Sequence, residues 1–371
     1  MKKSIKKAEI DFTVMEALKN IKSHYRQDKK IDAIATAQVL LAFKYFRADF
    51  NDKLNVEESL LNDQIKSPGN SRGYAGWGDV TNFYKMANTE ATCMALLALH
   101  DEYGNDPRIQ AGLNWLMKSA IRCLRDEGWG IMPGDISRVY TTCLALKTLK
   151  EYGKANTYEY ERGLNWLIKV QNPDKGWGSK PGDTSNITYT SRVIITLTSI
   201  GYDVNNENLK SAVQWLKGQT RSVVQTKWNI KYEYKESILF RGRELVFHHM
   251  PVQTVFIALI LSGNTKSFTV FDGVNELIKY NNDYFWTHPS FEDGTRKPLW
   301  AIFDTLMVCK ALQDTTHNWP STKIIQTNGH TLSYIYAGHP CLFGVLGGKE
   351  SGCTRLLIQP LLDWLKVSWR K

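Results

Sequence analysis

The sequence predicts an all-α protein: a double-layered α/α barrel built from helix pairs, followed by a short C-terminal β-hairpin and a terminal helix. Three observations support this prediction. A phrase of the type Gly-Leu-Asn-Trp-Leu returns about every 50 residues, a Gly-Trp-Gly phrase follows it, and an apolar stretch closes each unit. Self-similarity at a fixed period is the signature of a repeat architecture.

The first phrase predicts an amphipathic outer helix. In its first copy Leu113, Trp115 and Leu116 stand against the polar Lys118, so one face of the helix meets water. The copies of the phrase are Gly112–Leu116, Gly163–Leu167, Ala212–Leu216 and Gly273–Leu277.

The second phrase predicts a loop and the third an inner helix that is apolar nearly all round. The loops carry Trp77, Trp129 and Trp177, and weaker copies carry Trp228 and Trp286. The inner helices are expected at Thr89–Tyr103, Ser137–Tyr152, Asn186–Ile200, His249–Leu261 and Pro298–Leu312. All but the last end at a glycine that can adopt positive φ, namely Gly104, Gly153, Gly201 and Gly263.

A further pair precedes these units, with Phe12–His24 as its first helix and Ile31–Phe46 as its inner helix. An open solenoid needs polar capping repeats. About six pairs can instead close on themselves as a barrel.

The last part of the chain departs from the repeat. We expect helix-pair repeats over residues 1–315, and over residues 316–371 a hairpin and a helix that pack on them. Lys323–Tyr336 alternates around Asn328-Gly329, which indicates a β-hairpin, and Leu356–Trp369 reads as an amphipathic helix. The mixed charges of Lys231–Glu244 predict a solvated loop that could act as a lid.

Net charge favours an anionic partner. The chain of 371 residues has a formal charge of +10, which suits nucleic acid, a diphosphate or a membrane surface, although ordinary solubility charge explains it equally well. No apolar run is long enough to span a membrane and no signal peptide is evident, so we expect a cytoplasmic protein. Cys93 and Cys143 lie in apolar helical patterns and should pack as small hydrophobic residues.

The stretch Gln171–Asp183, followed by the helix from Asn186, resembles the repeat of protein prenyltransferase β subunits and squalene/terpenoid cyclases. The resemblance extends over about residues 70–312. It implies an (α/α)6 toroid whose inner helices point their N-termini toward one mouth of a central cavity. It also implies that the Gln and Trp residues of the loops tie the repeats together, which makes Trp129 and Trp177 structural.

Polar and basic residues gather where the inner helices begin, while the helix bodies stay apolar. An apolar barrel with a basic mouth suits an isoprenoid diphosphate, and helix N-termini add partial positive charge and N–H donors. The candidates for binding the diphosphate or another anion are His248, Arg296, Lys297, Arg138 and Arg192, and those for lining the cavity are Tyr140, Tyr189 and Trp300. The alternative for His248 is that it is an ordinary polar residue at the entrance of a helix. The alternative for Arg138 and Arg192 is a salt bridge within a loop.

Three family signatures bear on the reaction. The zinc site of protein prenyltransferases needs an Asp with a nearby Cys, but no Cys stands beside Asp293, which argues against zinc. The DxDD acid of class II cyclases and the DDxxD magnesium motif of class I terpene synthases are both absent. Mg²⁺ is left open as a companion of a diphosphate substrate, and no metal-binding residue is assigned.

The catalytic candidates are Glu90 and Asp304. When the phrase that follows DxDD in the cyclases is aligned with Ala95–Leu99, Glu90 falls on the acid position. A buried carboxyl in an apolar pocket keeps its proton, as a proton donor must. The alternative is that Glu90 is a first-turn acid that complements the helix dipole.

Two classes of function remain from the sequence. The first is an enzyme that binds an isoprenoid diphosphate and carries out prenyl transfer or cyclisation. The second is a non-catalytic toroid that binds a nucleotide, nucleic acid or another anion, or docks a partner protein. The basic residues are scattered and not interleaved with stacking aromatics, so the support for nucleic acid is weak. A carbohydrate-processing barrel is a third reading, against which the repeat resemblance counts.

Overall fold

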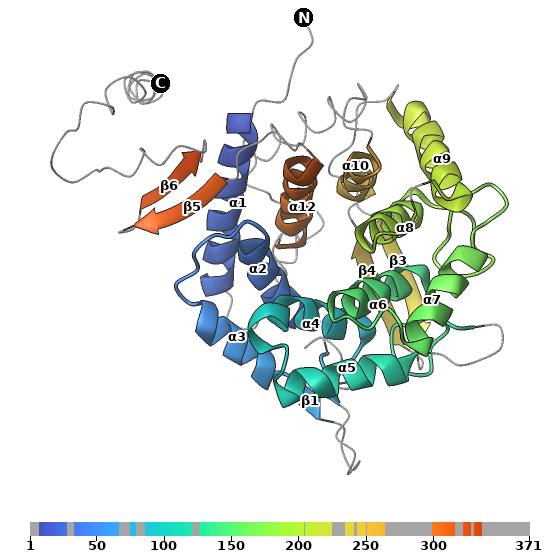
Figure 1. Cartoon of the computed structure of the whole chain (residues 1–371), viewed down its shortest axis with the longest axis horizontal. Helices are drawn as coiled ribbons and strands as arrows, with labels where there is room; N and C mark the ends of the chain where they lie inside the picture. The colour runs from blue at the N-terminus through green and yellow to red at the C-terminus, as the bar shows by residue number, and fades with distance from the viewer. Residues whose placement is uncertain are drawn as a thin grey trace, which may run out of the picture.

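The computed structural model describes the greater part of the chain (Figure 1). The described residues are 7–27, 33–66, 75–78, 86–120, 126–203, 205–224, 234–240, 243–249, 251–263, 299–315, 322–327 and 330–335.

An inner ring of helices forms the centre of the fold, as Figure 1 shows. Each inner helix contacts the next one along the chain, and the last contacts the first, so the ring closes. Its members are α2 (Ala33–Tyr45), α4 (Thr89–Tyr103), α6 (Val139–Glu151), α8 (Ile187–Ser199), α10 (Pro251–Leu261) and α12 (Leu299–Thr315). In α2 every residue from Ala33 to Phe43 is buried, as expected for a helix that is apolar all round. The predicted all-α toroid is confirmed.

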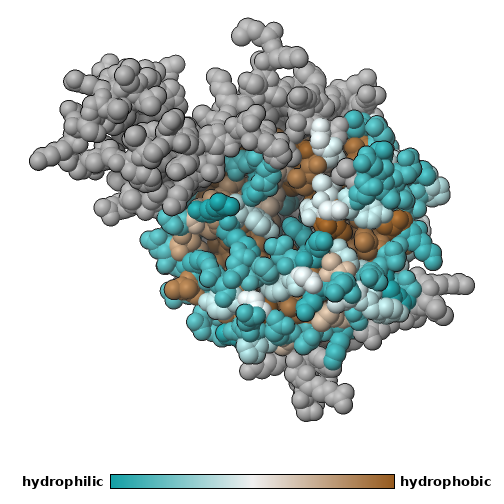
Figure 2. Space-filling model, viewed as in Figure 1, coloured by the Kyte–Doolittle hydropathy of each residue, from teal (hydrophilic) through white to brown (hydrophobic). Residues whose placement is uncertain are grey.

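An outer layer of helices covers the ring. Helix α1 (Lys7–Gln27) packs against α2 and α12, and α3 (Lys53–Asn62) against α2. Helices α5 (Pro107–Ser119), α7 (Tyr158–Lys169) and α9 (Glu207–Val224) pack against α4, α6 and α8 in turn. Polar residues (teal) cover most of the described surface in Figure 2, with smaller apolar patches between them, which agrees with the amphipathic pattern of these helices.

Most of the expected helix boundaries hold to within a few residues. Thr89–Tyr103 is the full extent of α4. Gly153, Gly201 and Gly263 follow their helices with φ of 66°, 76° and 81°, in the left-handed region that glycine adopts without steric cost. Gly104 is different: its φ is −49°, so α4 ends without a left-handed residue.

In the three loops that the structure describes, the tryptophan joins an outer helix to the inner helix that follows it. Trp129 is fully buried, and its indole Nε1–H donates to the Leu116 carbonyl near the end of α5 at 2.8 Å. Its backbone N–H donates to Thr142 Oγ1 at 2.9 Å and its carbonyl accepts from the Arg138 N–H at 2.9 Å, both at the start of α6. Trp77 and Trp177 repeat this pattern on Leu60 and Thr92, and on Leu167 and Thr190.

Neighbouring units also interlock through their repeated phrases. A Cβ placed on Gly163, in the outer helix α7, would lie 2.3 Å from Cζ3 of Trp129, so only glycine leaves room for the indole there. Gln171, two residues after the end of α7, is bonded to Asn208 at the start of α9. The Gln171 side-chain amide donates to the backbone carbonyl of Asn208 at 3.0 Å, and the Asn208 side-chain amide donates to Gln171 Oε1 at 2.6 Å. The loop tryptophans and the glutamine therefore have the structural role that the resemblance implied.

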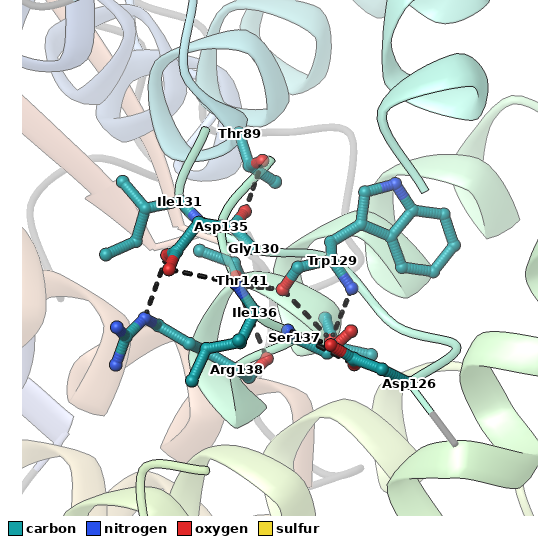
Figure 3. Close-up of polar contacts among 11 residues, drawn as sticks. Thr89, Asp126, Trp129, Gly130, Ile131, Asp135, Ile136, Ser137, Arg138 and Thr141 are labelled. Carbon is teal, nitrogen blue, oxygen red and sulfur yellow. Dashed lines mark hydrogen bonds and ion pairs between the residues drawn. The ribbon is translucent and has the colours of Figure 1, made fainter. Parts of the chain in front are cut away.

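At the start of α4 and of α6, the first backbone N–H group of the helix donates a hydrogen bond to a loop carbonyl of the next unit. Thr89 N–H donates to the Ile131 carbonyl at 2.9 Å, and its Oγ1 donates to the Gly130 carbonyl at 2.7 Å (Figure 3). Val139 N–H, at the start of α6, donates to the Ser179 carbonyl at 2.9 Å. The expectation of free N–H donors is therefore wrong at these two positions.

Short antiparallel strand pairs accompany the helices. The pair β1 (Ile65–Lys66) and β2 (Ala75–Gly76) stands in the first Gly-Trp loop. Strands β5 (Thr322–Thr327) and β6 (His330–Ile335) form the C-terminal hairpin predicted around Asn328, with Thr327 opposite His330. The expected helix at 356–369 lies outside the described residues, and the proposed boundary at residue 315 stays a prediction.

The insert in the fourth repeat is a β-hairpin, not the loop that its charges predicted. Strand β3 (Tyr234–Phe240) pairs with β4 (Arg243–His249), and His248 lies opposite Lys235. Aromatic and β-branched residues such as Phe240 and Val246 favour strand here, and they outweigh the charged residues between them. Helix α10 accordingly begins at Pro251, after the two histidines.

The cysteines of the described inner helices are packed in the core, as predicted for two of them. Cys93, Cys143 and Cys309 are free thiols with 0%, 3% and 1% exposure. Burial raises the pKa of each thiol to about 12, so they are unreactive at neutral pH. None of the described helices is long and apolar enough to span a membrane.

Candidate functional site

Four polar side chains from four inner helices meet inside the ring, and we call them the central cluster: Glu90 of α4, Tyr140 of α6, Arg192 of α8 and Asp304 of α12. Arg192 interacts electrostatically with Glu90 and Asp304, although α8 neighbours neither α4 nor α12 in the ring. Side chains of non-adjacent helices can interact in this way only across the interior of the ring. The cluster therefore faces inward.

Glu90 and Tyr140 are joined directly. Tyr140 Oη donates to Glu90 Oε1 at 2.6 Å. The two residues are the second residues of α4 and α6, so the repeat brings them to the same level of the ring. Burial, followed by the neighbouring Glu90 carboxylate, raises the pKa of Tyr140 well above its ordinary value, so the phenol stays protonated and serves as a hydrogen-bond donor.

Arg192 lies over the Tyr140 ring, with its guanidinium carbon 5.1 Å from the ring centroid. This distance is within the range of a cation–π interaction. Burial opposes the charge of Arg192, but the nearby Tyr140, Asp304 and Glu90 raise its pKa above the ordinary value. The guanidinium therefore carries its charge inside the ring.

Asp304 lies in the second turn of α12. Burial raises the pKa of its carboxyl to about 6, even though the positive charge of Arg192 acts in the opposite direction. A carboxyl with a pKa near neutrality can both give and take a proton at working pH.

Apolar side chains continue from the cluster along the inner helices. Each stands three or four residues after a cluster residue and so on the same helix face. They are Met94 after Glu90, Leu144 after Tyr140, Ile195 after Arg192 and Met307 after Asp304. The interior is thus polar at one level and apolar beyond it.

Arg138 is held by a loop. It is 7% exposed, and its Nε donates to Asp135 Oδ2 at 3.0 Å, an ion pair visible in Figure 3. The same Asp135 carboxylate accepts from the N–H groups of Ile131 and Ile136. This is the loop salt bridge that the sequence left open as an alternative to anion binding.

The other sequence candidates are not part of the cluster as described. Tyr189 is 1% exposed and packs in the core. His248 lies in β4 and Trp300 in the first turn of α12, and their side chains lie outside the described part of the structure. Arg296 and Lys297, and the segment around Asp293 where the family's zinc ligands would stand, also lie outside it.

Sequence reasoning found all four members of the cluster but not how they pair. Tyr140 was expected only to line the cavity, whereas it donates the hydrogen bond to Glu90. The signal that could have revealed this is the equal position of the two residues in successive inner helices. Asp135, the partner of Arg138, was not singled out by any motif.

Comparisons with known proteins agree with this architecture. A family model described as the prenyltransferase alpha-alpha toroid domain matches residues 12–216. Among solved structures, Candida albicans protein geranylgeranyltransferase-I complexed with GGPP is similar, with a TM-score of 0.51 and 12% identity over 79% of this chain and 89% of that one. A protein from Actinoplanes has a TM-score of 0.48 and 11% identity over 82% and 99% of the two chains. No curated protein matches the sequence. Since the family model extends over more than half of the chain, this protein belongs to the prenyltransferase alpha-alpha toroid family.

Proposed function

We propose that this protein binds an isoprenoid diphosphate inside the ring and acts on it by prenyl transfer or cyclisation. The observation that carries the proposal is the central cluster, a cation and two carboxyl groups at the edge of an apolar interior. The structural relative complexed with GGPP, itself an isoprenoid diphosphate, supports the same ligand class.

The two parts of such a ligand suit the two levels of the interior. The hydrocarbon would lie along Leu144, Ile195 and Met307, where each buried CH₂ contributes about 0.8 kcal/mol, so a fifteen-carbon chain could supply on the order of 10 kcal/mol before the costs of binding. The diphosphate would meet Arg192. His248, Arg296 and Lys297 are proposed to hold its outer oxygens at the mouth.

The cluster favours a reaction that moves a proton. In this proposal Asp304 donates its proton to an alkene carbon: the O–H bond of the carboxyl breaks, a C–H bond forms and the substrate becomes a carbocation. A proton then leaves a neighbouring carbon of the cyclised cation toward Glu90, whose position is fixed by Tyr140. General acid–base catalysis of this kind contributes about 10²- to 10⁴-fold to a rate.

Binding is tested by the Arg296→Ala/Lys297→Ala double variant. Wild-type protein should melt at a higher temperature with geranyl, farnesyl or geranylgeranyl diphosphate, because a ligand that binds only the folded state stabilises it. The double variant should lose this protection, since it lacks two cations proposed for the diphosphate. Lys2→Ala/Lys3→Ala, at the start of the chain, is a control with the same loss of charge. Absence of protection in the wild type would end the isoprenoid proposal.

Turnover is tested by Glu90→Gln, with mass spectrometry of the products. We expect unchanged thermal protection by the diphosphate and a loss of turnover of about 10²-fold or more, because the amide cannot accept the proton. Glu102→Gln, an exposed carboxylate on the same helix, should keep full turnover. Full turnover of Glu90→Gln removes Glu90 from the mechanism, and binding without any turnover of the wild type favours a non-catalytic toroid.

A further inference from the structure

Arg192 is a half-buried cation, and among the described residues it has no direct counterion. Its Nε has no hydrogen-bond partner, and within the described residues its guanidinium forms no ion pair. Its guanidinium carbon lies over the face of the Tyr140 ring, 5.1 Å from the ring centroid. A guanidinium presents several N–H donors in a fixed plane, and a buried donor such as this Nε is costly to leave unmatched. The structure therefore holds an anion-binding group that no described side chain satisfies.

Asp304 has the complementary property. Within the described part of the chain its carboxyl forms neither a hydrogen bond nor an ion pair, yet it interacts electrostatically with Arg192 across the ring. The two groups thus influence each other without contact. Any anion that settles on Arg192 changes the potential at Asp304.

We propose that Arg192 is the residue that binds the diphosphate inside the ring, and that anion binding there drives proton uptake by Asp304. This inference rests on the proposed function and adds its regulation: the acid gains its proton when the substrate's anionic group arrives. With the ring empty, the positive charge of Arg192 favours the ionised carboxylate. A bound anion cancels that charge, so the carboxyl becomes a proton donor only when there is a substrate to protonate.

Among the described residues, few charged groups other than Arg192 act on Asp304. Asp304 acts on Tyr140 directly, and both Asp304 and Glu90 act on Arg192. Helix α1 brings Asp11, which acts on Cys309, and helix α10 has no ionisable side chain. The last turn of α2 carries Lys44, which is paired with Asp101, and on α12 itself Lys310 is paired with Asp314. Of the cations that the structure describes, Arg192 is therefore the one whose neutralisation matters most for Asp304.

The coupling is measured by titration calorimetry with inorganic sulfate, a dianion that does not titrate between pH 5 and 8. Binding heats at pH 7 in PIPES and in imidazole, whose ionisation enthalpies differ, give the number of protons taken up. Wild type should take up between about one half and one proton for each sulfate bound, because most Asp304 is ionised before binding and protonated after it. Asp304→Asn should bind sulfate with no uptake, whereas Asp314→Asn, on the exposed end of the same helix, should behave as wild type.

Arg192→Gln should weaken sulfate binding by about tenfold or more, and Arg192→Lys should restore part of it. Arg162→Gln, which removes a guanidinium paired with Glu127 outside the ring, should leave it unchanged. Circular dichroism checks that each variant folds. By linkage, wild-type affinity should rise by up to tenfold for each pH unit from 8 to 6, with no such rise in Asp304→Asn.

Three outcomes overturn the inference: no binding of sulfate to the wild type, equal binding to Arg192→Gln, or binding without proton uptake that depends on Asp304. The proposed function fails separately. If geranyl diphosphate raises the melting temperature of the wild type but sulfate binding takes up no proton, isoprenoid binding is retained and only the coupling is removed. If geranyl diphosphate does not raise the melting temperature, both isoprenoid binding and the coupling that depends on it are removed.

Discussion

Asp304→Asn should be more stable than the wild type at pH 7 and should lose at least about 99% of its turnover. Burial raises the folded-state pKa of Asp304 from 3.8 to about 6, and each pKa unit corresponds to about 1.4 kcal/mol. Ionisation of this carboxyl therefore costs the folded wild type up to about 3 kcal/mol at neutral pH. Asparagine resembles the protonated acid in shape and avoids that cost, but it has no proton to donate.

The sign follows from proton binding. Between pH 4 and 6 the folded state holds the Asp304 proton while the unfolded state has released it, so this group's contribution to stability is greatest below about pH 4 and is lost as the pH rises to about 6. Urea unfolding measures the free energy of unfolding between pH 4 and 6. The decline of this free energy with rising pH should be absent in Asp304→Asn and present in Asp314→Asn. A variant less stable than wild type at pH 7 would mean that the electrostatic attraction of Arg192 for the Asp304 carboxylate outweighs the cost of burying it.

Gly163→Ala should destabilise the protein by about 1–3 kcal/mol, the usual cost of inserting a methyl group into a packed site. The new Cβ would lie 2.3 Å from Trp129 Cζ3. The indole cannot withdraw without breaking its hydrogen bond to the Leu116 carbonyl, so the strain falls on the contact between α7 and the preceding loop. Chemical denaturation measures the change.

Gly218→Ala is the matched control. Gly218 also lies within an outer helix, α9, but no atom lies within 4 Å of its added Cβ. Alanine there should stabilise the protein by about 0.5–1 kcal/mol, because glycine is the poorer helix former. If the two glycine-to-alanine substitutions change the free energy of unfolding in opposite directions, the effect at Gly163 comes from its contact with Trp129 and not from helix propensity. Equal effects would mean that the Gly163–Trp129 contact carries no special constraint.

The sequence predicted the toroid because its repeat reports directly on helix pairing and burial. Helix α4 was predicted to its end residues, and the glycine stops at Gly153, Gly201 and Gly263 follow from local backbone geometry. Trp77, Trp129 and Trp177 stand at the same place in three units, so the role that they share in the described part of the chain could be predicted from the repeat. Such features depend on contacts within a unit or between consecutive units.

The interactions of the site were harder to predict, because those of Arg192 with Glu90 and Asp304 join units that are not consecutive. Nothing in the local sequence around Asp304 indicates that it acts on Arg192 across the ring. Arg138 occupies the position that Asn88 and Asn186 hold in neighbouring units, yet its partner Asp135 belongs to no repeated phrase. The strand that contains His248 was missed because its charged residues concealed the alternation of a hairpin.

The loop tryptophans, together with the forward bonds of Thr89 and Val139, use residues that are entirely separate from the central cluster. The residues that hold the units together and the residues of the central cluster therefore occupy different positions in the sequence of each unit. The inward-facing residues of α4, α6, α8 and α12 could therefore be redesigned for another reaction while the hydrogen bonds that join the units are kept.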